Sequence, residues 1–158
     1  MSSSIPPTKS HAGEPNPAPR FTGRCAKARW CMAESVATML LDAAREDAKA
    51  VRALSGLPDI SDAILGFHAQ QSVEKALKAV LSSNGVAFRR THDIAELLDL
   101  ITDYGLPSPP FAEFLDELNP FAVEARYGLI DPGAIDRLQA LEWISQVLDW
   151  AAAASRPE

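Results

Sequence analysis

From residue 35 onward, apolar residues recur every three or four positions, and no stretch alternates apolar with polar residues. That spacing is typical of one face of an α-helix, whereas a strand with one buried face alternates with a period of two. The pattern predicts helices over residues 35–54, 61–83 and 94–101, a broken helical segment over 111–127, and a last helix over 131–154. Short connections between such helices favour an all-α, up-and-down antiparallel bundle of four to five helices with no sheet.

Several of these helices carry end signals in the sequence. Asn84-Gly85 follows the second helix, and this pair suits a left-handed C-cap. Asp93 and Glu96 form a D-x-x-E capping pattern at the start of the third helix. Asp131-Pro132 is expected to open the last helix, because proline is favoured in a first helical turn.

The chain divides near Met32. Residues 1–31 hold five of the twelve prolines, show no helical period and carry a net charge of +4. Residues 32–158 carry ten Lys and Arg against twenty Asp and Glu, a net charge of −10. The first part is typical of a disordered basic tail, unless translation starts at Met32. The second part is long enough for one helical domain with its own core.

Composition narrows the classes of function. The longest apolar runs are too short to cross a bilayer and no apolar N-terminal segment marks a secretory signal, so we expect a cytoplasmic protein. Cys25 and Cys31 have no nearby histidine that would complete a zinc site, and we expect neither a metal nor a cofactor. A domain at −10 lacks the basic face that sequence-indifferent nucleic-acid binding requires, although a local cationic groove is compatible with it.

The helix over residues 61–83 has two different sides. Its polar stripe contains His68, Gln71, Lys75 and Lys78, opposite the apolar side chains expected in the core. Ile64 and Phe67 interrupt this stripe. Polar residues flanked by exposed apolar ones indicate a contact surface, whereas the alternative interpretation is a plain solvated face.

Asp47 is an unusual residue on the first helix. On a helical wheel it falls on the apolar face, among Val36, Leu40, Val51 and Leu54. An unpaired carboxylate in that position would cost several kcal/mol, so the sequence predicts a cationic partner. The candidates are Lys75, Lys78 and Arg126, and the alternative is a carboxylate at the bundle rim that accepts from a backbone N–H or water.

Three blocks in order, FHAQQSVEKALKAVL at 67–81, THDIAELL at 91–98 and ARY at 125–127, resemble the HEPN family (higher eukaryotes and prokaryotes nucleotide-binding domain). The resemblance implies an all-α bundle that dimerises, with a polar groove at the interface. By that resemblance the groove is lined on one side by His68, Gln71, Lys75 and Lys78, and on the other by Arg126 and Tyr127. We expect Asp47 to pair with one of the cations and so to be the seventh residue of this site, with His92 as a secondary one. His92 and Asp93 match the family's HD pair, and we expect a local hydrogen bond for His92 and a capping role for Asp93.

Many members of the HEPN family are metal-independent ribonucleases that carry an Arg followed by a His four to six residues later. Their chemistry needs a base for the ribose 2′-hydroxyl and a cation for the developing phosphorane charge. No histidine of this chain follows an arginine at that spacing, and Arg126 is followed by YGLIDPG.

The resemblance therefore implies a non-nuclease HEPN protein that binds a nucleotide or a small nucleotidyltransferase, as in a two-gene pair of the toxin–antitoxin kind. The negative charge and the lack of a glycine-rich phosphate loop favour a protein partner over tight binding of a free nucleotide. The alternative is an atypical ribonuclease or nucleotide-handling enzyme that uses His68 as the base and Arg126 as the cation.

Overall fold

The computed structural model describes residues 24–155, apart from the side chains of residues 24–30, 125 and 126. The described residues form five α-helices and two short 3-10 helices, and they contain no strand. The helices are α1 (Arg24–Leu54), α2 (Asp62–Ser83), α3 (Ile94–Asp103), α4 (Asn119–Val123) and α5 (Arg137–Ala154), with η1 (Leu115–Leu118) and η2 (Glu124–Tyr127) on either side of α4. The all-α prediction is confirmed. None of these helices is both long and apolar enough to span a bilayer.

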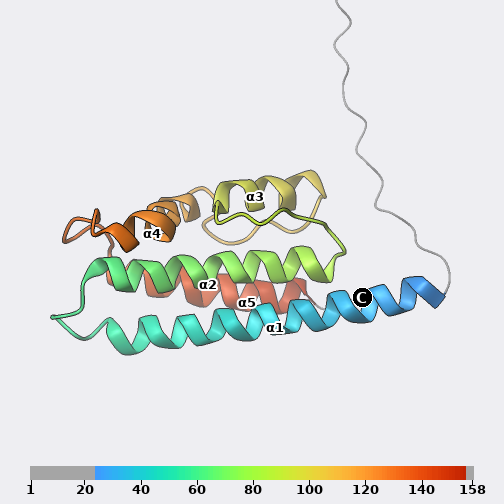
Figure 1. Ribbon diagram of the computed structural model, residues 1–158, viewed down its shortest axis with the longest axis horizontal. Helices are drawn as coiled ribbons and strands as arrows, with labels where there is room; N and C mark the ends of the chain where they lie inside the picture. The colour runs from blue at the N-terminus through green and yellow to red at the C-terminus, as the bar shows by residue number, and fades with distance from the viewer. Residues whose placement is uncertain (1–23, 156–158) are drawn as a thin grey trace, which may run out of the picture.

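Figure 1 shows α1, α2 and α5 side by side along the long axis, with α3 and α4 on the other side of α2. α2 contacts each of the other four α-helices. α1 and α2 form an antiparallel hairpin, but α2 and α5 run parallel. Arg137 at the start of α5 bonds Asp62 at the start of α2, and Asn84 after α2 donates to the carbonyl of Ala154 at the end of α5. The broken segment from α3 to η2 makes the return between them.

The core is centred on the apolar side of α2, as the periodicity predicts. Leu65, Ala69, Val73, Leu77 and Val80 are all buried. Their spacing of three and four keeps them on one side of the helix, where α1, α3 and α5 can cover them.

The apolar face expected for α1 is wrong in part. Val36 and Met39 are exposed, and the side chains of α1 that enter the core are Ala37, Leu41, Ala44, Ala48 and Val51. Alanines allow two helix backbones to approach closely, and here Ser72 of α2 donates to the carbonyl oxygen of Ala44 at 2.9 Å. Small residues, rather than the largest apolar ones, therefore mark the contact between α1 and α2.

α4 approaches α2 closely at Gly66. A Cβ atom at this position would lie 2.1 Å from Cδ1 of Phe121, which is closer than non-bonded carbon atoms can come. Phe121 is itself buried, so its ring occupies the space that a side chain at position 66 would need. Glycine at position 66 is required for this packing.

The helix ends agree only partly with the sequence signals. Asp93 caps α3 by accepting from the N–H of Ala95, and Gly85 after α2 has a φ of +69°, so both of these predictions are confirmed. Asp131-Pro132 does not open α5: the helix begins at Arg137, after Asp136 accepts from the N–H groups of Leu138 and Gln139.

The start of α1 also differs from the expectation. α1 begins at Arg24, before the boundary expected at Met32, although the first of its side chains described as buried is Ala37. Residues 1–23 lie outside the described part of the chain. The predicted tail and the division into a tail and a domain therefore stay predictions.

Candidate functional site

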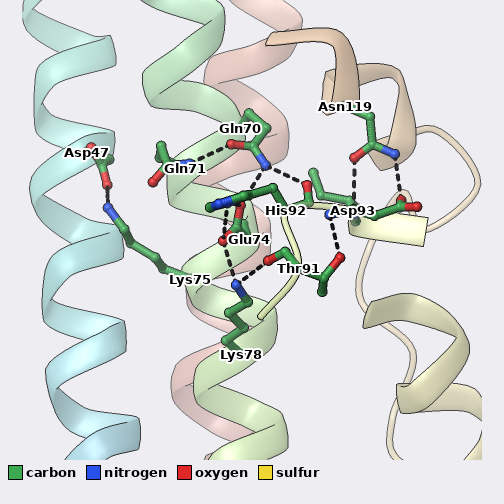
Figure 2. Close-up of polar contacts among 11 residues, drawn as sticks. Asp47, Gln70, Gln71, Glu74, Lys75, Lys78, Thr91, His92, Asp93 and Asn119 are labelled. Carbon is green, nitrogen blue, oxygen red and sulfur yellow. Dashed lines mark hydrogen bonds and ion pairs between the residues drawn. The ribbon is translucent and has the colours of Figure 1, made fainter. Parts of the chain in front are cut away.

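Asp47 lies on the side of α1 that faces α2, where it bonds two residues of the predicted polar stripe. Lys75 Nζ donates to Asp47 Oδ2 at 2.5 Å (Figure 2), and His68 Nδ1 lies 2.9 Å from Asp47 Oδ1. The Asp47 side chain is only 14% exposed. The prediction that this carboxylate needs a cationic partner is confirmed, with Lys75 as the partner.

The Asp47 contact also fixes the orientation of the His68 ring. An ionised carboxylate can only accept hydrogen bonds, so His68 Nδ1 carries the hydrogen. In the neutral ring Nε2 is then the acceptor. This arrangement of carboxylate and imidazole resembles the way a general base is oriented in many enzymes.

Glu74 is the centre of a second cluster, which the helical periodicity of the sequence does not predict. Its carboxylate is 5% exposed and accepts from Gln70 Nε2 at 2.8 Å and from Lys78 Nζ at 2.6 Å. His92 Nδ1 lies 3.1 Å from the same carboxylate. Figure 2 shows these side chains converging from α2 and from the segment that leads into α3. A buried carboxylate is stable only with partners of this kind.

Two of the same α2 side chains hold the backbone of that segment. Gln70 Nε2 also donates to the carbonyl of His92 at 3.1 Å, and Lys78 Nζ donates to the carbonyl of Thr91 at 2.5 Å. The hydrogen bond expected for His92 is therefore present, but its ring bonds Glu74 on α2 rather than a local group. Asn119 fixes the same region from α4, donating to Asp93 and accepting from the N–H of Ile94 (Figure 2).

Gln71 connects the middle of this surface to the buried cluster, because its Nε2 donates to Gln70 Oε1 at 2.8 Å. The polar side chains of α2 thus span the surface between Asp47 on α1 and the segment before α3 (Figure 2). We call this set the polar face: Asp47, His68, Gln70, Gln71, Glu74, Lys75, Lys78 and His92. Its members are held by one another, so the surface is ordered before any ligand arrives.

The charges of the polar face balance. Each carboxylate has one lysine: Lys75 pairs with Asp47, and Lys78 pairs with Glu74. Neither lysine is therefore a free cation that could attract a phosphate without losing an existing partner. The carboxylates and the lysines of the polar face are therefore equal in number, and the face offers directed hydrogen bonds.

The two arginines before α3 differ in their partners. Arg89 makes a two-bond contact with Glu96, at 2.6 and 2.7 Å. This contact lowers the pKa of the Glu96 carboxyl and raises the pKa of Arg89. Arg90 is exposed, and within the described part of the chain its side chain has no hydrogen bond or ion pair. Among the described residues, Arg90 is thus an unpaired cation two residues before His92 in the chain.

The other side of the predicted groove, formed by Arg126 and Tyr127, has fewer described contacts than the side on α2. η2, which carries Arg126 and Tyr127, contacts α2. Tyr127 is exposed, and among the described residues it makes no hydrogen bond to the polar face. The side chain of Arg126 lies outside the described residues, so its pairing with Asp47 or a ligand stays a prediction. The grouping of all seven predicted residues in one binding site also stays a prediction.

One signal in the sequence could have revealed the buried cluster. Gln70, Glu74 and Lys78 are spaced by four residues and therefore lie in one row along α2. Gln70, the first residue of that row, lies at the edge of the apolar side of α2. Glu74 is one turn further along the same row, and both side chains are buried. Within residues 24–155, no group of three or more His, Cys, Asp or Glu side chains is arranged to hold a metal ion.

Comparison with protein families shows a match to the HEPN domain over residues 37–153. The matched region extends from Ala37, the first residue described as buried in α1, almost to the end of α5, and it contains the whole polar face. Comparison with curated proteins and with solved structures finds no match for the chain.

Proposed function

The chain belongs to the HEPN domain family, and from this membership we propose that it is a non-nuclease member that acts by binding a nucleotide or a nucleotidyltransferase-type protein partner. The observation that carries the proposal is the polar face, whose half-exposed side chains His68, Gln71 and Lys75 are each held by an internal partner. Binding to an ordered surface costs less conformational entropy than binding to a mobile one. Such a surface suits recognition.

The sequence supports binding over RNA cleavage. The Arg-x4–6-His motif of the ribonucleases in this family is absent, and the cations of the polar face are already paired. We therefore propose that this protein is the HEPN member of a two-gene pair of the toxin–antitoxin kind, with a nucleotidyltransferase as the second member. The partner's surface, or a nucleotide that it carries, would contact His68, Gln71, Lys75 and Lys78.

The test measures binding directly. Isothermal titration of the purified protein with AMP, ADP and ATP, and with a nucleotidyltransferase encoded next to it, should give a dissociation constant for at least one of them. Gln71→Ala should weaken that binding about tenfold, which corresponds to about 1.4 kcal/mol. Lys49→Ala is the matched control, because Lys49 is exposed on α1 and, among the described residues, pairs with Glu46 alone. Absence of binding to all four probes would overturn the proposal.

One observation favours a second candidate function. Asp47 holds His68 by Nδ1, which is the arrangement of an oriented general base. An atypical ribonuclease or nucleotide-handling enzyme could use His68 as that base and Arg126 as the cation. RNA turnover by the purified protein that is lost in both His68→Ala and Asp47→Asn would support this candidate. Turnover that survives both changes would exclude it.

A further inference from the structure

We propose that His92 is a further ligand-contacting side chain of the polar face, that Glu74 is its positioning residue, and that His92 binds the phosphate of a nucleotide together with Arg90. This inference deepens the proposed function and rests on its nucleotide-binding form. Three features of the structure support it: the partners that already satisfy the buried Glu74, the hydrogen bonds that hold the segment carrying His92, and the unpaired Arg90 two residues earlier in the chain.

The first feature is the buried carboxylate of Glu74. Lys78 alone would neutralise this carboxylate, and Gln70 would satisfy its second oxygen. The third partner, the His92 ring, is 61% exposed and so contributes little burial to the core. Glu74 is therefore already satisfied without His92, and the main effect of the 3.1 Å contact is to orient the His92 ring with Nδ1 toward the protein.

The second feature is the set of hydrogen bonds that hold this segment. Gln70 donates to the carbonyl of His92, Lys78 donates to the carbonyl of Thr91, and Glu74 accepts from the His92 ring. Three α2 side chains therefore bond two consecutive residues. Since a carboxylate only accepts, Nδ1 carries the hydrogen and Nε2 is left for another molecule. An exposed side chain held this firmly is unusual, because exposed rings normally sample several rotamers. Preorganisation of this kind favours ligand binding.

The third feature is the charge of Arg90. Arg90 and His92 are both exposed, on either side of the buried Thr91, so the two side chains reach solvent within two residues of each other. Arg90 has no side-chain partner among the described residues, whereas Arg89 is engaged by Glu96. A guanidinium can bond two phosphate oxygens at once, and an imidazole that carries hydrogen on both ring nitrogens can donate from Nε2 to a third while Nδ1 donates to Glu74. The surroundings of His92 are therefore the part of the polar face that suits a phosphate.

The experiment follows the imidazole nitrogens by NMR in the full-length protein, with AMP, adenosine and inorganic phosphate as probes. In the free protein His92 should be the tautomer with hydrogen on Nδ1. AMP should shift the His92 ring nitrogens, and adenosine should not, because it lacks the phosphate. Inorganic phosphate should produce the same shift at higher concentration if the phosphate alone is recognised.

Variants separate binding from positioning. His92→Gln and Arg90→Ala should each weaken AMP binding at least tenfold, whereas Arg52→Ala, which removes another exposed arginine, should not. Glu74→Gln combined with Lys78→Met removes both charges, so that no lone charge is buried. In this double variant the folded protein should show mixed His92 tautomers and weaker AMP binding. A purely structural role for Glu74 would leave the tautomer unchanged.

The outcomes are distinguishable. If AMP shifts the signals of His68 but leaves those of His92 unchanged, this inference fails and the proposed nucleotide binding stands. If His92 is the Nε2–H tautomer in the free protein, or if His92→Gln binds AMP as tightly as the wild type, the inference also fails. If none of the three probes shifts either ring, the nucleotide form of the proposed function fails together with it.

Discussion

Glu46 and Asp47 are neighbouring acidic residues on α1 with opposite surroundings. The Glu46 side chain is 71% exposed and pairs only with Lys49, one turn away on the same helix. The Asp47 side chain is 14% exposed and bonds Lys75 and His68 of another helix. An exposed pair within one helix stabilises little, whereas removal of one partner from a desolvated group leaves the other without compensation.

We therefore expect Asp47→Ala to lower the free energy of unfolding by about 2–3 kcal/mol, because it leaves Lys75 and His68 without their acceptor. Glu46→Ala should change it by at most about 0.5 kcal/mol. Urea denaturation of the two variants measures both values. Equal stability of the two variants would mean that the contact between α1 and α2 does not depend on this carboxylate.

Gly66 gives a second prediction at the same scale. Gly66→Ala should lower the free energy of unfolding by about 1–2 kcal/mol, because the overlap with Phe121 outweighs the gain in helix propensity. Gly56→Ala is the control and should be nearly neutral, since a Cβ there has no neighbouring atom within 4 Å. In a double-mutant cycle, Phe121→Leu should recover part of the loss. Simple additivity of the two changes would contradict the proposed overlap.

Single residues were only partly predictable from the sequence. Asp47 was recognisable because helical periodicity places it near the core, and a carboxylate there requires a cation. Glu74 was not recognised, because its angular position on α2 is polar and its burial comes from residues 91 and 92, which pack there only in the folded chain. Periodicity predicts the buried face of α1 only in part, because alanines, rather than the largest apolar residues, make much of the contact with α2.

At the scale of helices, Arg137 connects three parts of the chain. Its guanidinium donates to the carboxylate of Asp62 at the start of α2 and to the carbonyls of Leu57 and Ile60 in the preceding loop. Asp62 also accepts from the N–H of Gly133. This single side chain thus fixes the start of α5 against both the α1–α2 loop and α2.

Arg137→Ala should lower the free energy of unfolding by about 2–3 kcal/mol, because Asp62 loses its cationic partner and two carbonyls lose their donor. Arg137→Lys should recover only part of this, since an ammonium group lacks the planar fork that reaches all three acceptors. Arg45→Ala, which removes an exposed pair within α1, should have little effect. The prediction fails if Arg137→Lys is as stable as the wild type in urea.

The helices themselves were more predictable than their ends. α2 has a strict apolar period over its whole length, so its core side chains followed directly from spacing. The predicted start of α5 at residue 131 is too early, because Asp131-Pro132 and Asp136 are both acceptable start signals and local sequence alone does not rank them. Gly133, with a φ of +84°, turns the chain between them. The parallel pairing of α2 and α5 depends on contacts between distant residues, which periodicity does not report.

For the whole molecule, we propose a homodimer with the polar stripe of α2 at or beside the interface, since HEPN domains often dimerise. Ile64 is an exposed apolar residue beside that stripe. Ile64→Glu should weaken the dimer without lowering the melting temperature, because the side chain lies outside the core. Met39→Glu, at an exposed apolar position on α1, should leave the dimer intact. Sedimentation of the wild type as a monomer at tens of micromolar would contradict the proposal.

The second whole-molecule prediction concerns the N-terminal region. Deletion of residues 1–31 should change the melting temperature by no more than about 2 °C and leave the oligomeric state unchanged, because the first described core side chain of α1 is Ala37. Differential scanning calorimetry and sedimentation measure the two properties. A loss of many degrees would show that this region packs against the domain.

The parallel pairing of α2 and α5 also determines when the bundle can close during synthesis. α1 and α2 are consecutive, whereas the contacts that fasten the two ends of α5 to α2 join residues 75 and 70 positions apart. Contacts between distant residues cost more loop-closure entropy and form later. α5 is the last of these helices to leave the ribosome, so the side of α2 that it covers stays open until then. A ribosome that stalls before residue 154 would display an unfinished helix pair with an exposed apolar surface, which is prone to aggregation.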